Sequence, residues 1–92
     1  MTRSDTAAAI EPMLVLSTAH VTQATCNTFL PAYDGPAWEK GDYGWFIYVV
    51  EDTSALPPDL IACLALAREA GACWVMLDRD AAETPRLPTY DW

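Results

Sequence analysis

A single histidine and the residues around it have the types needed for nucleophilic catalysis. His20 follows a short apolar run, and Ser17 and Cys26 lie near it in the sequence. A histidine beside a hydroxyl or a thiol can act as the base that activates a nucleophile. A lone histidine also has structural uses, such as capping a helix or bonding at the surface. This pattern alone therefore does not predict a catalytic site.

A pair of aspartates, with a glutamate close behind, follows the last apolar run. Asp78 and Asp80 are two residues apart, and alternate residues of a strand point to the same side, so the pair could share a cation such as Mg²⁺. Arg79 between them would instead neutralise the cluster, and aspartates are common turn formers. We keep a small metal-dependent hydrolase built on His20, Asp78 and Asp80 as an alternative. The prediction itself is no metal, no cofactor and no catalytic activity.

The cysteines and the chain start indicate a compartment. Cys26, Cys63 and Cys73 are odd in number and form no CxxC pair, so their spacing does not suit zinc. The first residues have no apolar core of a secretory signal, and no apolar run approaches the ~20 residues of a membrane-spanning helix. We expect reduced, buried thiols in a cytoplasmic protein without a membrane segment.

The charge balance favours a basic protein partner over nucleic acid. The formal net charge is −8, from 13 acidic and 5 basic side chains. Such a surface repels phosphates, so direct binding to DNA or RNA is disfavoured, whereas a basic partner is attracted. Carboxylates that line one edge could imitate a row of phosphates; an evenly spread acidic surface would only confer solubility. The candidate partner-binding residues are Asp34, Glu39, Asp42, Glu51, Asp52, Asp78, Asp80 and Glu83.

Apolar runs and turn residues predict the elements that position these side chains. A flexible arm at 1–12 precedes a single domain at 13–92. Buried strands are expected at 13–18, 44–51 and 72–77, and a short edge strand at 37–39. One helix is expected from Thr22 to about Leu30, where Pro31 ends it. A second begins at the proline pair 57–58 and ends at Gly71.

This order of elements, β-α-(β)-β-α-β, predicts an α/β protein of the α+β two-layer sandwich type. We expect a three- or four-stranded sheet with two helices on one face. The 44–51 strand, the second helix and the 72–77 strand together predict a right-handed βαβ unit, in which the two strands are parallel.

The 44–51 strand is apolar on both faces, with Phe46, Tyr48 and Val50 on the second one. Strands of this kind are normally covered on both sides. Either the C-terminal tail at 81–92 folds over the second face, or another protein chain does. In the latter case Phe46, Tyr48 and Val50 form a self-association face, and a homodimer is possible.

Several short blocks carry a family resemblance. LSTAH at 16–20, YGWF at 43–46, LDRDA at 77–81 and YDW at 90–92 resemble a family of small bacterial domains of unknown function. That family is encoded on plasmids and integrative elements, often near anti-restriction genes. The resemblance spans about residues 13–92 and implies a genomic context; it assigns no catalytic residue, cofactor or partner.

The sequence therefore predicts a small acidic, non-catalytic binding protein of a mobile genetic element. It would inhibit a host nucleic-acid-handling defence enzyme, such as a CRISPR or restriction effector, through its negative surface. The alternatives are a homo-oligomeric structural or regulatory protein that uses the second sheet face, and the hydrolase described above.

Overall fold

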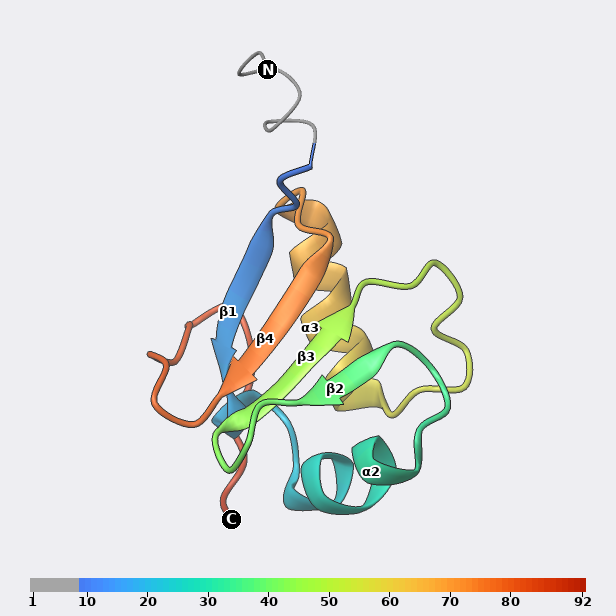
Figure 1. Cartoon of the computed structure of the whole chain (residues 1–92). Coiled ribbons are helices and arrows are strands. Elements are labelled where there is room, and N and C mark those ends of the chain that lie inside the picture. The colour runs from blue at the N-terminus through green and yellow to red at the C-terminus, as the bar shows by residue number, and fades with distance from the viewer. Residues whose placement is uncertain (1–8) are drawn as a thin grey trace.

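The domain is built on one four-stranded mixed sheet. A computed structural model describes residues 9–92, in which β1 (Met13–Ser17), β2 (Ala37–Glu39), β3 (Gly44–Tyr48) and β4 (Trp74–Asp78) pair in the order β1-β4-β3-β2. Helix α3 (Pro58–Glu69) lies against one face (Figure 1). The predicted α+β class is confirmed, and each predicted strand is present: β2 has the predicted ends, and the other three differ by one to three residues.

The strand directions correct one expectation. β1 and β4 are parallel, but β3 is antiparallel to both of its neighbours, so β3, α3 and β4 do not form a βαβ unit. The loop at 49–57 carries the chain back along the sheet before α3 begins (Figure 1). Since α3 then returns in the same general direction as β3, β4 must start where β3 ends and run the opposite way.

The first helical segment does not end at its proline. It contains a π-helical turn, η2 (Thr25–Phe29), followed by the short α2 (Leu30–Ala32), which includes Pro31. The Leu30 N–H bonds to the Thr25 carbonyl, five residues back. Proline in a regular helix clashes with the carbonyl four residues earlier, and the wider π turn relieves that conflict. The predicted stop at Pro31 is therefore wrong.

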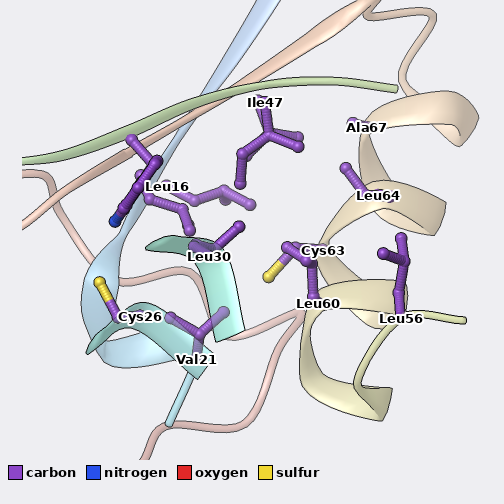
Figure 2. Close-up of a cluster of buried hydrophobic side chains, with 13 residues drawn as sticks. Leu16, Val21, Cys26, Leu30, Ile47, Leu56, Leu60, Cys63, Leu64 and Ala67 are labelled. Atoms are coloured by element: carbon purple, nitrogen blue, oxygen red, sulfur yellow. The ribbon is translucent and has the colours of Figure 1, made fainter. Parts of the chain in front are cut away.

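The core lies between the inner sheet face and the helices. Apolar side chains of α3 meet those of the three longer strands and of the first helical segment, which packs at the start of α3 (Figure 2). Burial of this kind contributes about 25 cal/mol per Å² of apolar area. The residues are Leu16, Val21, Cys26, Leu30, Trp45, Ile47, Leu56, Leu60, Cys63, Leu64, Ala67, Val75 and Leu77.

One buried carboxylate joins the two helical segments. Asp59, in the first turn of α3, accepts hydrogen bonds from the Thr22 N–H at 2.7 Å and from the Thr25 hydroxyl at 3.0 Å. A carboxylate at this place also compensates the positive end of the helix dipole. Asp59 is therefore a buried structural residue and not part of the acidic surface.

The C-terminal tail packs beside the end of β1, away from the second sheet face. The Tyr90 N–H bonds to the Ala19 carbonyl, and the Trp92 indole N–H bonds to the Val21 carbonyl at 3.0 Å. Leu87 packs against the core. The first of the two options for covering the second face is therefore wrong.

The segment before β1 is partly described. Residues 1–8 of the predicted arm lie outside the described residues, whereas the Pro12 carbonyl accepts from the Cys73 N–H at 2.8 Å. No helix within residues 9–92 is both long and apolar enough to span a membrane.

Candidate functional site

The sheet face opposite α3 is broad, apolar and open. Register places Met13, Trp74 and Tyr48 in one row across it and Val15, Met76, Phe46 and Trp38 in the next. The exposed fractions are 54% for Trp38, 45% for Val15, 40% for Met13 and 38% for Tyr48. An apolar surface of this composition is typical of interaction sites. We call these side chains the open sheet face.

Aromatic contacts hold the open sheet face together. The ring of Trp74 lies 5.8 Å from that of Trp38 and 5.1 Å from that of Tyr48, measured between centroids. The Tyr48 ring meets the Trp74 ring edge-on, and the Trp38 ring is tilted against it, so that the three rings pack as one cluster. Of the predicted self-association residues, Phe46 and Tyr48 lie on this face. Val50 follows the end of β3 and packs against the core, because the strand ends at Tyr48.

The predicted acidic residues separate into two groups at opposite ends of the sheet. Asp34, Glu51 and Asp52 lie in loops beside the end of β3, where the Tyr48 N–H bonds to the Pro36 carbonyl. The others lie where β4 ends and β3 begins, or in the tail that follows. This second group is Glu39, Asp42, Asp78, Asp80 and Glu83. The structure therefore does not bring all the candidates into one row.

Two ion pairs are formed by the described residues. The Lys40 Nζ lies 2.9 Å from the Asp78 carboxylate, and the Arg86 guanidinium lies 3.0 Å from that of Glu69. The Arg86 pair is largely exposed, so it contributes little to stability.

The remaining described cations also have internal contacts. The Arg68 guanidinium donates to the Val50 carbonyl, and the Arg79 guanidinium carbon lies 4.6 Å from the Tyr43 ring centroid. Residues 9–92, which leave out Asp5 and Arg3, carry 12 acidic and 4 basic side chains. The surface charge is therefore dominated by carboxylates.

The Asp78 carboxylate is already engaged within the protein, by Lys40 and by the backbone N–H of Asp80. The hydrogen bond from Lys40 and that from the Asp80 N–H hold the pKa of Asp78 below its usual range. Across residues 9–92 the histidine, cysteine and carboxylate side chains form no group of three or more with the geometry of a metal site. The arrangement is a turn closed by an ion pair.

His20 serves as an internal clamp. It is 1% exposed, its Nδ1–H donates to the Pro88 carbonyl at 2.9 Å, and its Nε2 accepts from the Thr84 N–H at 2.9 Å. Both ring nitrogens are thereby used on the tail, and neither bonds to Ser17 or Cys26. The proposed base and nucleophile are not brought together. The bonds also define the neutral Nδ1–H tautomer.

All three cysteines are free thiols, and the two buried ones have little nucleophilic character at neutral pH. Burial raises the pKa of Cys63 to about 12. Burial also raises the pKa of Cys26, although a hydrogen bond with Trp45 acts to lower it. Since the thiolate is the reactive form, both side chains behave as small apolar groups.

A cleft of about 610 Å³ opens at the end of the sheet where β4 ends. Its walls combine aromatic rings, carboxylates and the first helical segment, and five stretches of chain contribute to it. Glu39 and Asp42 are among the predicted binding residues, but no spacing in the sequence groups them with the other residues of the cleft. The lining residues are Thr18, Cys26, Asn27, Pro31, Glu39, Gly41, Asp42, Tyr43, Gly44, Trp45, Arg79 and Trp92.

Comparison with models of protein families finds a match. The model described as "Family of unknown function (DUF5983) C-terminal domain" matches residues 13–92. No curated protein and no solved structure matches the chain.

Proposed function

Because the chain belongs to the DUF5983 C-terminal domain family, whose function is unknown, we propose a function from its surface: a non-catalytic inhibitor that docks on a basic protein. The partner class that fits is a nucleic-acid-handling defence enzyme, such as a CRISPR or restriction effector. The setting we propose is the cytoplasm of a bacterium that carries the gene on a mobile genetic element.

The excess of carboxylates is the observation that supports this proposal most. Twelve acidic side chains face four basic ones in residues 9–92, and each of the four basic groups contacts a carboxylate, a carbonyl or a ring of the protein itself. Few cations therefore remain to attract phosphate. A basic groove built for a duplex would instead attract this surface, at a rate that falls as salt screens the charges.

The group of carboxylates at the β4 end is the better candidate for that contact. Two of its five members, Glu39 and Asp42, line the cleft. Asp34, Glu51 and Asp52 lie at the other end of the sheet. Docking by charge at one end would block a nucleic-acid groove by occupying it, without any bond being made or broken.

Charge reversal at one end of the sheet tests the proposal. We expect the wild-type protein to inhibit DNA cleavage by at least one effector in a panel of purified CRISPR and restriction enzymes. The Asp42→Lys/Asp80→Lys variant is expected to require at least about tenfold more protein, because two attractive contacts become repulsive. The Glu51→Lys/Asp52→Lys variant is the matched control and should lose less.

Salt provides a second readout of the same experiment. Inhibition should weaken as ionic strength rises from about 50 mM to about 300 mM, since exposed charges are increasingly screened. The proposal fails if no effector is inhibited, or if the variant reversed at the β4 end inhibits as well as the wild-type protein.

The open sheet face supports a homodimer as a second candidate. Its exposed Trp38, Tyr48, Met13 and Val15 would be buried between two copies. Two chains of charge −8 repel each other, so this association should strengthen with salt, opposite to the trend expected for a basic partner. Sedimentation at low and high salt, with Trp38→Ser/Tyr48→Ser as the disrupted variant, decides it; a monomer at every concentration would exclude it.

A further inference from the structure

The cleft at the β4 end has the chemistry of a cation site. Three aromatic rings, Tyr43, Trp45 and Trp92, line it together with the carboxylates of Glu39 and Asp42. Within residues 9–92 neither carboxylate forms an ion pair. A flat, weakly hydrated cationic group could stack on the aromatic rings and also pair with the carboxylates.

We propose that this cleft binds the side chain of an arginine presented by a protein partner. The inference rests on the function proposed above and names the point of contact. Guanidinium is favoured over ammonium, because it is planar, stacks on aromatic rings and gives parallel hydrogen bonds to a carboxylate. The cleft is larger than one side chain, which leaves room for the backbone on either side of the arginine.

Arg79 of the protein itself already places a guanidinium over an aromatic ring of the cleft. The Arg79 guanidinium carbon lies 4.6 Å from the Tyr43 ring centroid, at the border of the cleft, and the Lys40 Nζ lies 5.3 Å from the same centroid. Tyr43 is thus already engaged by cations. The incoming guanidinium would use the free ring of Trp92 and the two carboxylates.

Trp92 is prepared for that role. Its side chain is 54% exposed, yet its indole N–H is held by the Val21 carbonyl at 3.0 Å. A ring fixed in place loses little conformational freedom when a ligand stacks on it. The carboxylates also disfavour an anionic ligand: two negative groups line the cleft against the one guanidinium of Arg79.

Titration with a small arginine derivative tests the site without knowledge of the partner. The probe is Nα-acetyl-arginine amide, followed by NMR of the tryptophan indole N–H groups. Nα-acetyl-citrulline amide is the control, since it has almost the same shape but no charge. We expect Trp92 and Trp45 to shift with arginine, with a dissociation constant in the millimolar range, and to shift little with citrulline. Trp38 and Trp74, on the open sheet face, should not move.

Paired variants locate the binding. Glu39→Gln/Asp42→Asn is expected to weaken arginine binding by about fivefold or more. Glu51→Gln/Asp52→Asn removes the same charge at the other end of the sheet and should leave it nearly unchanged. Equal shifts with citrulline, shifts at Trp38 and Trp74 instead, or stronger shifts with inorganic phosphate would each overturn the proposal.

The outcomes separate this site from the wider function. If arginine binds in the cleft but no effector is inhibited, the arginine site is supported and the inhibitor function is rejected. If the Glu39→Gln/Asp42→Asn variant inhibits an effector as strongly as the wild-type protein does, the inhibitor function is supported. The cleft is then rejected as its point of contact.

Discussion

Replacement of Gly44 by alanine is expected to lower the free energy of unfolding by about 4 kcal/mol or more. A Cβ at this position would lie 1.7 Å from the Leu77 carbonyl oxygen, and the residue has φ +151°, which side chains rarely adopt. The clash is with the backbone of β4, the strand between β1 and β3. That backbone cannot shift without breaking pairs on both sides. Urea unfolding followed by tryptophan fluorescence measures the loss.

Gly41→Ala is the matched control. Gly41 also has positive φ, at +53°, but a Cβ there would meet nothing within 4 Å. The cost should be that of the backbone conformation alone, about 1 kcal/mol. Equal losses in the two variants would show that conformation, and not the contact with β4, sets the requirement for glycine at position 44.

The strands could be predicted because their sequences are distinctive. The run from Gly44 is rich in β-branched and aromatic residues, and it forms β3 from its first residue. The three-residue β2 was also anticipated, as an edge strand between turns. Alternation along β3 correctly separates buried Trp45 and Ile47 from outward Phe46 and Tyr48.

The direction of β4 could not be predicted in the same way. The hydrophobic period identifies a strand and its two faces. The direction of β4 relative to β3 depends instead on the end of the sheet at which α3 begins, and the path of the loop at 49–57 determines that. Pro31 is a similar case. The rule that proline ends a helix assumes regular spacing, and the π turn at Thr25–Phe29 departs from it.

The candidate sites divide along the same line. Net charge and strand alternation are properties of the sequence. The acidic surface and the outward direction of Phe46 and Tyr48 could therefore be predicted. The cleft is assembled from segments as far apart as Thr18 and Trp92. No spacing brings these together. The tail could be predicted to pack from its apolar residues, but its docking position depends on His20.

Replacement of His20 by alanine is expected to cost about 3 kcal/mol and to release the tail. The ring is buried, and its two nitrogens bond to the backbone of Pro88 and Thr84. Truncation leaves a cavity and two backbone groups without their partner, each at a cost of about 1–3 kcal/mol unless water replaces the bond. Denaturant unfolding measures the stability, and hydrogen exchange of residues 81–92 measures the release.

His20→Gln is the informative second variant. A glutamine amide can donate with its nitrogen and accept with its oxygen, so it can keep part of both bonds. We expect its stability to fall between wild type and His20→Ala. If the two variants are equally stable, the bonds to the tail contribute little and the burial of the ring alone matters.

The same pair of variants links the fold to the cleft. Trp92 lines the cleft and belongs to the tail that His20 holds, so release of the tail should remove one wall of the proposed arginine site. His20→Ala should then lose arginine binding, while His20→Gln keeps most of it in proportion to the order of its tail. A catalytic histidine would behave differently, because glutamine would restore the fold but not proton transfer. If arginine binding falls in both variants in proportion to the loss of order in the tail, His20 acts by positioning Trp92 in the wall of the cleft.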